Sequence, residues 1–448
     1  MSQQVFVIDS KNPEDLAMMQ ALYSRSAASV TTHLEKVNKT KSGKFMESFY
    51  VGYGHESIGD CGSTSIFIEN VSILAAKAIQ DWPLYSGQET STRYIDMSKQ
   101  SLTDPIGSEE SKQILSNWME FYLMAQDKLC RHLKEQYAIK NDETLKDYNK
   151  AIRVRSFDIL RGFLPAAINT QLSWHTNFRQ AANKLALLIH HPDKIIAELA
   201  SNILKKLQEQ YPSSFSHKKY PETEKYREEM VKKYTYFDRN VEESNEFFQG
   251  LADIFKGDME KVYCKTTITN ESLKPYMDAI KNRPIKTELP QFLSDLGQVT
   301  FDFFLDFSSF RDIQRHRNGV CRMPILTTNY GFHQWYLNAL PEGLRTNAIS
   351  LLTRQCELIE KLNVSEIVKQ YYIPIGFRVP CHITYGLPAT LYVIELRSGN
   401  TVHSTLRQVA HKMKEALLKK LPEIVMHVDE NADEWNLKRG QQDIVEKS

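Results

Sequence analysis

The sequence predicts an α+β protein made of two tandem domains of one kind, each with a mixed or antiparallel sheet and long helices. Three observations support this. A length of 448 residues exceeds one ordinary domain. Strand-like alternations stand beside long amphipathic helical runs, and a weak internal repeat relates the two halves. We place the domains at 1–225 and 226–448, with the polar stretch 213–234 as the boundary.

Each copy of the repeat begins with a strand that leads into a helix. In the first copy Phe67–Val71 alternates like a strand, and Ile73–Gln80 follows as a helix. In the second copy Phe301–Leu305 leads into a similar helical run. Pro83 should end the first helix early, whereas the second helix can present Arg315–Arg317 at its C-terminal end.

Further along, each copy has an apolar segment with a proline, and then an amphipathic helix. The proline segments are Arg161–Pro165 and Tyr372–Pro374. The apolar residues at helical spacing are Ile196, Leu199, Ile203 and Leu207 in the first copy, and Val402, Leu406, Val409, Met413 and Leu417 in the second. The first copy also carries a longer insert, which includes an amphipathic run from Ile114 to Tyr137.

The composition excludes several function classes. Lys and Arg total 56 against 55 Asp and Glu, so the formal charge is +1 and gives no pull toward nucleic acid or an anionic membrane. The start of the chain has no basic-then-apolar signal, and no long apolar run follows. Six cysteines without a CxxC pair suit a reducing compartment. We therefore expect a cytoplasmic protein without nucleic-acid or membrane partners.

Several short polar clusters could bind ligands, although each has an ordinary structural explanation. Ser91–Arg93 combines hydroxyls with a guanidinium and suits a phosphate-binding turn, but it could equally be a surface loop. Arg315–Arg317 flanks an imidazole with two permanent cations, or it is a solvated helix end. Asn177, Arg179 and Asn183 recur on one side of a helical run, as an exposed polar face would.

The order and spacing of these clusters resemble the flavin-dependent thymidylate synthases. The segments GHESI, ETSTRY and RGFLPAAINTQLSWHTNFRQAAN follow one another as in that family. There, an Arg-His-Arg triplet and a Ser-x-Arg-Tyr element share one short segment. Here they are divided, with Glu89–Tyr94 in the first copy and Arg315–Arg317 in the second. The first copy has Asp81–Pro83 in place of the triplet.

The resemblance implies a role for each matching residue. The residues implied for the deoxyuridylate phosphate and sugar are Glu89, Ser91, Thr92, Arg93 and Arg161. Those implied for the FAD are Asn177, Arg179 and Asn183, with His55 near it. Arg315 would bridge uracil and flavin, with His316 and Arg317 on the flavin. Arg397 would replace a nucleotide-binding arginine where the first copy has Leu188. We expect Arg93 and Arg315 to be catalytic, and no metal ligand is assigned.

The second copy departs from the pattern in a reciprocal way. It lacks the Ser-x-Arg-Tyr element and has Met323–Thr327 there. It also has Gln370, Gly386 and Tyr392 where the first copy has an arginine and two asparagines. Asp312 stands where the family has a glutamine, three residues before the triplet. The hypothesis is that the two halves share one active site.

By this resemblance the chain is an FAD-dependent enzyme that converts dUMP to dTMP, with methylenetetrahydrofolate and NADPH as co-substrates. A homodimer would mimic the family's tetramer of single domains. Two alternatives stay open: a non-catalytic nucleotide- or flavin-binding paralogue, and a flavin enzyme acting on another pyrimidine, which Asp312 makes conceivable. Pro380–His382 is similar to the nucleophile motif of the cysteine-dependent thymidylate synthases, but we expect Cys381 to be a buried small residue.

Overall fold

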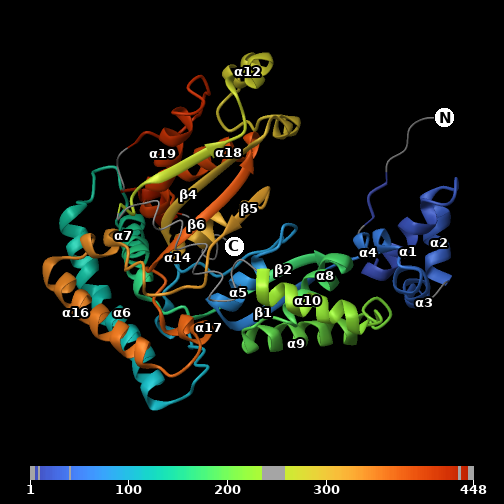
Figure 1. Ribbon diagram of the computed structural model, residues 1–448, viewed down its shortest axis with the longest axis horizontal. Coiled ribbons are helices and arrows are strands. Elements are labelled where there is room, and N and C mark those ends of the chain that lie inside the picture. The colour runs from blue at the N-terminus through green and yellow to red at the C-terminus, as the bar shows by residue number, and fades with distance from the viewer. Residues whose placement is uncertain (1–5, 9–10, 40–41, 235–257, 432–434, 442–448) are drawn as a thin grey trace. The chain divides into compact units, whose positions relative to one another are not determined.

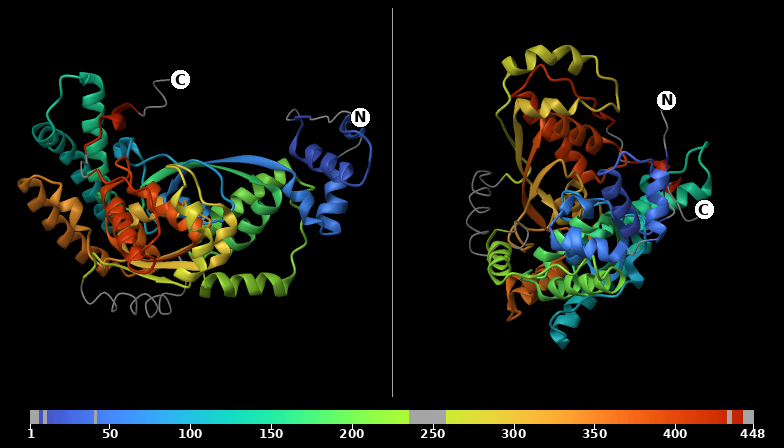
Figure 2. Two further views of the ribbon diagram at one scale, coloured as in Figure 1. Left: turned by 90° about the horizontal axis from the view of Figure 1, so that it is seen from above. Right: turned by 90° about the vertical axis from the view of Figure 1, so that its right-hand side faces the viewer.

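The computed structural model describes residues 6–8, 11–39, 42–234, 258–431 and 435–441 (Figures 1 and 2). The chain forms two compact units, and each is discontinuous in sequence. Unit 1 comprises the described residues within 1–69, 78–89 and 171–238. Unit 2 comprises those within 70–77, 90–170 and 239–448.

These units cut across the predicted copies, 1–225 and 226–448. The middle part of the first copy, residues 90–170, packs with the second copy instead of with its own ends. One physical reason is the burial of large side chains: the Trp118 indole is buried, and its Nε1 donates to the Tyr372 carbonyl at 3.0 Å. The duplication itself stays a prediction.

Unit 1 is mostly helical. Its helices are α1 (Pro13–Tyr23), α2 (Val30–Lys39), α3 (Ser42–Phe45), the π-helix η1 (Met46–Gly52), α4 (Glu56–Asp60), α8 (Phe178–Leu188), α9 (Lys194–Gln210) and α10 (Pro221–Tyr234). Strands β1 (Ser63–Ser72) and β2 (Asn169–Asn177) form a two-stranded sheet, and helix α5 (Ile73–Gln80) follows β1. Both strands and α5 run from one unit into the other. Helix α5 ends before Pro83, as predicted.

Capping side chains and apolar spacing explain helices α8 and α9. The Asn177 side chain accepts from the Gln180 amide at 2.8 Å and so satisfies a free donor at the start of α8. Ile196, Ile203 and Leu207 on α9 are buried, which confirms the predicted amphipathic helix.

The polar stretch predicted as a boundary belongs to the body of unit 1. Ser214 and Phe215 are buried, and α10 packs against α8. The Glu224 carboxylate of α10 lies 2.9 Å from His190 Nε2. Residues 213–234 therefore extend this unit, because their apolar and charged groups find partners on it.

Unit 2 contains a four-stranded antiparallel sheet of order β3-β4-β6-β5 (Figure 1). Its strands are β3 (Val262–Thr266), β4 (Gln298–Asp306), β5 (Gly319–Arg322) and β6 (Arg378–Gly386). Its α-helices are α6 (Glu109–Gln136), α7 (Leu145–Leu160), α12 (Asn270–Leu273), α13 (Met277–Lys281), α14 (Phe307–Ile313), α15 (Gln334–Asn338), α16 (Glu342–Lys361), α17 (Glu366–Lys369), α18 (Leu387–Ser398) and α19 (Ser404–Leu418). Its short 3₁₀ turns are η2 (Met97–Lys99), η3 (Arg161–Phe163), η4 (Lys274–Tyr276), η5 (Gln291–Leu296), η6 (Gln370–Tyr372) and η7 (Leu437–Gln441).

The sheet and the long helices of unit 2 follow from the sequence pattern. The predicted strand Phe301–Leu305 is the middle of β4, which is buried almost throughout because α18 and α19 pack on the sheet. The predicted run from Ile114 to Tyr137 is helix α6, which lies beside α16 (Figures 1 and 2). No described helix is both long enough and apolar enough to cross a membrane. The result is an α+β protein, mostly helical, with two small antiparallel sheets.

The two proline segments pair with each other through backbone hydrogen bonds, and these bonds are symmetrical between the two copies. Residues 161–168 and 370–377 have the same backbone structure, a 3₁₀ turn followed by a bridge residue at the proline and a second tight turn. The four backbone bonds run from Ala166 N to Ile373 O, from Ile375 N to Leu164 O, from Ala167 N to Tyr371 O, and from Gly376 N to Gly162 O, at 2.8 to 2.9 Å. Each bond has a mate with the copies exchanged, as in the isologous contact of a two-fold dimer.

Candidate active site

The Ser-x-Arg-Tyr fragment forms a tight turn in unit 2. The Ser91 carbonyl accepts from the amides of Tyr94 and Ile95 at 3.3 and 3.2 Å. The Ser91 hydroxyl accepts from the Arg93 amide at 3.2 Å, and Thr92 is buried. The sequence element therefore forms a turn, with its arginine turned toward the interior of the unit.

Arg93 is held by Asp158, a fully buried carboxylate on α7. Arg93 Nε and Nη2 donate to its two oxygens at 2.8 and 3.3 Å, and Nη2 also donates to the Thr401 carbonyl at 3.0 Å. Arg439 pairs with the same carboxylate. Burial opposes ionisation of Asp158, but Arg439 and Arg93 outweigh it and hold its pKa well below the usual range. The fork geometry fixes the guanidinium of Arg93 in one place.

Arg161, in the turn η3 that follows α7, is almost completely buried. Its Nη2 donates to the Ser309 hydroxyl at 2.9 Å, and its Nη1 lies 3.7 Å from the Asp312 carboxylate. Its Nε is buried and has no hydrogen-bond partner among the described residues. An unpaired buried donor on a charged group is costly, so this N–H favours a ligand that accepts from it.

The second fragment follows α14 in the same unit. Arg397 of α18 donates from Nη2 to the Asp312 carbonyl at 2.6 Å and from Nε to His316 Nε2 at 2.8 Å. Arg315 is exposed, and Arg317 Nη1 donates to the Arg315 carbonyl at 3.2 Å. The predicted position of the triplet, at the C-terminal end of a helix, is confirmed.

Asp312 is the carboxylate that connects the two fragments. Burial alone would raise its pKa, but four arginines outweigh burial and lower it strongly. These are, in order of effect, Arg161, Arg397, Arg315 and Arg93. Two of the four come from the first half of the chain and two from the second. The divided signature therefore meets around one carboxylate within a single chain.

His316 is a neutral imidazole with a defined tautomer. Burial is the largest cause that lowers its pKa to about 3, followed by the positive charge of Arg397. A guanidinium can only donate, so His316 Nε2 must accept from Arg397 and its proton must lie on Nδ1. His316 can orient Arg397 and donate one hydrogen bond, but it does not carry a charge near neutral pH.

The cluster holds more positive than negative charge. Five guanidinium groups, those of Arg93, Arg161, Arg315, Arg397 and Arg439, act on three carboxylates, those of Asp158, Asp306 and Asp312. Burial lowers the pKa of Arg397, and Arg315 and Arg93 lower it further, against the opposing effect of Asp312.

Sequence reasoning missed the side chains that support these arginines. The Ser309 hydroxyl bonds to Arg161 and lies 2.8 Å from the Thr405 hydroxyl, and the His403 Nε2 lies 3.1 Å from the Asp158 carbonyl. Asp158 had a signal, since it is a carboxylate inside an apolar run three residues before Arg161. For His403 and Arg439, which lie near the C-terminus, nothing in the sequence indicates that they contact Asp158.

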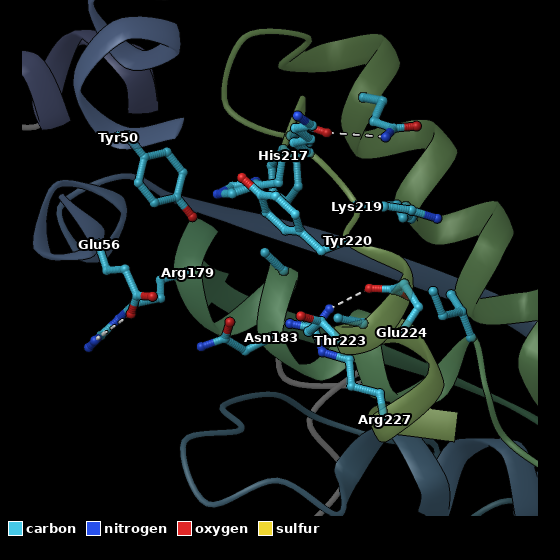
Figure 3. A pocket seen from close by; sticks show the side chains of 17 residues that line it. Tyr50, Glu56, Arg179, Asn183, His217, Lys219, Tyr220, Thr223, Glu224 and Arg227 are labelled. Atoms are coloured by element: carbon cyan, nitrogen blue, oxygen red, sulfur yellow. Dashed lines mark hydrogen bonds and ion pairs between the residues drawn. The ribbon is translucent and has the colours of Figure 1, made fainter. Parts of the chain in front are cut away.

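Of the residues predicted for the flavin, Asn177, Arg179 and Asn183 lie in unit 1 and Arg315–Arg317 in unit 2. Arg179 Nε donates to Asp60 Oδ1 at 2.8 Å, and its Nη1 lies 3.6 Å from Glu56. Asn177 is used as the cap of α8. Arg179 and exposed Asn183 both line a pocket of about 250 Å³ (Figure 3).

Two further predicted residues, His55 and Glu89, are also in unit 1. His55 precedes the first residue of α4, and its ring meets Tyr53 edge-on at 6.2 Å. The Glu89 carboxylate accepts from Gln80 Nε2 at 2.8 Å. The candidate site residues are thus found as two groups: Ser91–Arg93, Arg161, Arg315–Arg317 and Arg397 in unit 2, and His55, Glu89, Asn177, Arg179 and Asn183 in unit 1.

Cys381 is not a nucleophile. It is buried on β6, and burial, followed by the neighbouring Cys321, raises its pKa well above the ordinary value. The thiol is therefore protonated, and its sulfur lies 3.4 Å from the Val379 carbonyl. The prediction of a buried small residue is confirmed, and all six cysteines are free.

Comparison with known proteins finds a family match for the first half of the chain. Residues 6–213 match the family model of the thymidylate synthase complementing protein, and this part of the chain belongs to that family. The second half lies outside the match.

Similar proteins extend over most of the chain. A UPF0159 protein of Chlamydia pneumoniae is 24% identical over 83% of this chain and 77% of its own. Another, of Thermoplasma acidophilum, is 23% identical over 89% and 91%, and one of Chlamydia muridarum is 24% identical over 84% and 79%. Their name states no activity. The similarity covers both halves, so the arrangement of two halves in one chain is common to these proteins.

Proposed function

We propose that this chain is a flavin-dependent thymidylate synthase-like enzyme that transfers a one-carbon unit from methylenetetrahydrofolate to C5 of deoxyuridylate. The observation that carries the proposal is that Asp312 is contacted by an arginine from each half, by Arg161 at its carboxylate (3.7 Å) and by Arg397 at its carbonyl (2.6 Å). Family membership of residues 6–213 supports the reaction class.

In this proposal the arginines bind the nucleotide phosphate. A phosphate would place negative charge beside these guanidinium groups, and the unpaired Nε of Arg161 would gain an acceptor. Arg93 stays fixed by Asp158, so little conformational entropy is lost when the ligand binds. We assign the hydroxyl of Ser91, at the start of the turn, to the same phosphate as a further donor.

Arg315 is placed to act on the pyrimidine ring. It is exposed at the edge of the cluster, while Arg397 behind it is held by His316 and the Asp312 carbonyl. In this proposal negative charge develops on a ring carbonyl during the reaction, and guanidinium donors held in place stabilise such charge. Neutral His316 is suited to hold this geometry and not to transfer a proton.

FAD fits the residues of unit 1. Arg179 and Asn183 face one pocket whose lining combines cations, tyrosines and an apolar floor, as an anionic aromatic ligand requires (Figure 3). When bound, FAD would supply the hydride that family members use to complete the transferred methyl group, with NADPH as the source of electrons. Within unit 1, Arg179, Asn183 and His55 would hold it.

We expect one nucleotide site per chain, although the chain has two copies. The positions of the first copy that match Arg315–Arg317 and Arg397 are Asp81–Pro83 and Leu188. In the second copy, Met323–Thr327 stands in place of the Ser-x-Arg-Tyr element, and Gln370 matches Arg161. None of these is a cation, so a second phosphate site has no arginine. A homodimer would then hold two sites, in place of the four of a tetramer of single domains.

Asp312 favours one alternative within the same chemistry. Its pKa is strongly lowered, so the carboxylate is ionised and can only accept hydrogen bonds. A pyrimidine with an amino group would donate to it, whereas a uracil carbonyl would not. A flavin-dependent enzyme acting on an amino-pyrimidine nucleotide is therefore the second candidate.

Three measurements on the purified chain test the proposal. We expect a flavin spectrum, one dUMP bound per chain by calorimetry, and dTMP formed only with methylenetetrahydrofolate and NADPH present. Turnover of dCMP in place of dUMP would select the amino-pyrimidine alternative. Tight nucleotide and flavin binding without turnover of either nucleotide would identify a non-catalytic paralogue, and no flavin binding at all would exclude both enzymes.

A further inference from the structure

A buried chain of four hydrogen bonds runs from Arg161 to the backbone of α7. Arg161 Nη2 lies 2.9 Å from the Ser309 hydroxyl, and that hydroxyl lies 2.8 Å from the Thr405 hydroxyl. The Thr405 hydroxyl lies 2.8 Å from His403 Nδ1, and His403 Nε2 lies 3.1 Å from the Asp158 carbonyl. All five residues are buried. The chain therefore joins η3, α14, the start of α19 and α7 inside unit 2.

The two ends of this chain fix the direction of every bond in it. A guanidinium only donates and a backbone carbonyl only accepts, so His403 Nε2 carries the proton that it donates to Asp158. A neutral ring then accepts at Nδ1, and the Thr405 hydroxyl donates to it. The Ser309 hydroxyl accepts from Arg161 and donates to Thr405; it lies farther from Nδ1, at 3.4 Å. One arrangement of protons thus satisfies the whole chain.

The His403 ring is kept neutral and is held in place by its surroundings. Burial is the largest cause that lowers its pKa well below the ordinary value, and the positive charge of Arg161 lowers it further. The ring packs between aromatic side chains, with its centroid 4.7 Å from that of Trp335 and 5.4 Å from that of Tyr336. A protonated ring would donate from Nδ1, and the bond from Thr405 would then be lost. His403 is therefore a fixed acceptor at the end of the hydroxyl pair.

The chain determines which way the guanidinium of Arg161 faces. Its Nη2 is held by Ser309, and its Nη1 lies 3.7 Å from the Asp312 carboxylate. A guanidinium is planar, so these two contacts set the direction of its buried Nε, which has no hydrogen-bond partner among the described residues. The far end of the chain is the carbonyl of Asp158, whose carboxylate holds Arg93. One residue thus anchors both arginines of the first half.

Only one of the two copies has a hydroxyl at the position of Ser309. Helices α5 and α14 begin at Ile73 and Phe307, in the register that matches Asp81–Pro83 to Arg315–Arg317. In this register Ser309 matches Ala75, and both are buried. The acceptor for Arg161 is therefore divided between the copies in the same way as the arginines are.

We propose that His403 is a positioning residue of the nucleotide site: through two hydroxyl groups it sets the direction of the ligand-binding N–H of Arg161. The inference rests on the proposed function for the identity of the ligand, a nucleotide phosphate. It goes beyond that function because the second half of the chain then supplies, besides its own arginines, the support that orients an arginine of the first half.

Thr405 is the residue at which the chain can be interrupted with the least change in shape. Thr405→Val keeps the size of the side chain but removes the hydroxyl, and Thr405→Ser retains the hydroxyl. By calorimetry we expect Thr405→Val to bind dUMP about fivefold more weakly than the parent, and Thr405→Ser to bind it as the parent does. The matched control is Thr390→Val, which removes another buried hydroxyl of unit 2, bonded to the Gly386 carbonyl at 2.9 Å. It should leave dUMP affinity unchanged.

A double-mutant cycle separates positioning from a general loss of packing. In an Arg161→Gln background the Thr405→Val change should cost no further dUMP affinity, because the chain then has no guanidinium to direct. In the parent background it should raise KM for dUMP and leave kcat unchanged, as expected for a contact made equally before and during the reaction. An equal loss of affinity in both backgrounds overturns the inference. Parental affinity in Thr405→Val, or an equal loss in Thr390→Val, overturns it as well.

A second measurement needs neither ligand nor turnover. The Nε–H of Arg161 gives an NMR signal that is assigned by its absence from Arg161→Gln. This proton should exchange slowly with solvent in the parent and in Thr405→Ser, and faster in Thr405→Val, where the side chain is less firmly held. Equal exchange in all three proteins overturns the inference. Faster exchange in Thr405→Val, in a chain that binds no dUMP, keeps the positioning of Arg161 and removes the proposed function.

Discussion

Two regions of this molecule have the same backbone conformation but carry side chains of different chemistry. The first is η3, β2 and α8, and the second is η6, β6 and α18; each runs from a 3₁₀ turn through a proline segment into a strand and a helix. Their turns exchange hydrogen bonds as equivalent partners. The first region begins with Arg161, and the second begins with Gln370.

The difference lies in what each first residue bonds to. Arg161 directs its guanidinium to Ser309 and Asp312 of the other half. Gln370 is also buried, but its Oε1 accepts from the Leu326 amide at 2.9 Å and its Nε2 donates to the Ile367 carbonyl at 3.2 Å. The glutamine therefore bonds to backbone groups of its own copy, whereas the arginine contacts side chains of the other copy in the arginine cluster.

The same exchange of roles occurs at the other equivalent positions. Ser91–Tyr94 is a polar turn, whereas Met323, Ile325 and Leu326 are buried apolar residues. At the helix positions the roles are reversed, since Leu188 is buried and Arg397 bonds to His316. The comparison teaches that both copies have the same backbone elements. At each of these positions, however, only one of the two copies has the proposed ligand-binding residue.

The largest expected effect comes from removing one arginine from each half. Arg93→Ala and Arg315→Ala should each lower kcat/KM by about 10²- to 10³-fold, because each removes a preorganised cation from one site. Both residues act on the Asp312 of their own chain. Mixing the two variants should therefore restore nothing in a turnover assay.

The control is Arg354→Ala, which removes an exposed arginine from α16 of the same unit and should leave kcat/KM unchanged. Recovery of activity on mixing Arg93→Ala with Arg315→Ala would mean that the two fragments function in different chains. That result would contradict the claim that the residues of the two copies form one site within a single chain.

A smaller effect separates the two equivalent residues. Arg161→Gln should weaken dUMP binding by roughly 10- to 150-fold, the equivalent of about 1.5–3 kcal/mol for a hydrogen bond to a charged group. Gln370→Met should leave dUMP affinity unchanged. It should lower the free energy of unfolding by about 1–3 kcal/mol, because the buried Leu326 amide loses its acceptor.

Calorimetry with dUMP and urea denaturation of both variants measure the two effects. A Gln370→Met protein that loses nucleotide affinity would show that the second copy contributes a ligand contact at this position. An Arg161→Gln protein with parental affinity would instead remove the buried guanidinium from the proposed site.

The smallest effect concerns acid sensitivity. The pKa of His316 is lowered to about 3 in the folded chain from an ordinary 6.5, so the unfolded chain binds the proton first as the pH falls. The contribution of neutral His316 to the free energy of unfolding is complete above pH 6.5. It is lost on acidification, and the free energy of unfolding falls by about 2 kcal/mol at pH 5. Buried His333 and His403 have lowered pKa values too and act in the same direction.

Comparison of the parent with His316→Gln isolates this residue, because glutamine still offers Arg397 an acceptor. Denaturant unfolding at pH 7, 6 and 5 should show a shallower loss of stability in the variant. Equal pH slopes would mean that His316 is not buried as a neutral ring. The lowered pKa values of Asp158 and Asp312 affect stability only at lower pH and do not contribute in this window.

The sequence by itself determined the local elements and the division of the signature. Alternation at Phe67–Val71 and Phe301–Leu305 predicted strands, and apolar spacing predicted α6, α9 and α19, because these periods follow from backbone geometry. The register between the copies also came from sequence. It matched Arg161 to Gln370 and Leu188 to Arg397, and the structure places both pairs at equivalent positions.

Only the tertiary structure decided which of these residues act together. Arg93 meets Asp158 on α7 and Thr401 near the C-terminus, and Asp312 collects arginines from both halves. Such pairs depend on how distant segments pack, and no local pattern encodes them. The pKa of His316 likewise depends on burial, and the pocket at Arg179 depends on α10 packing against α8, so both required the packed chain.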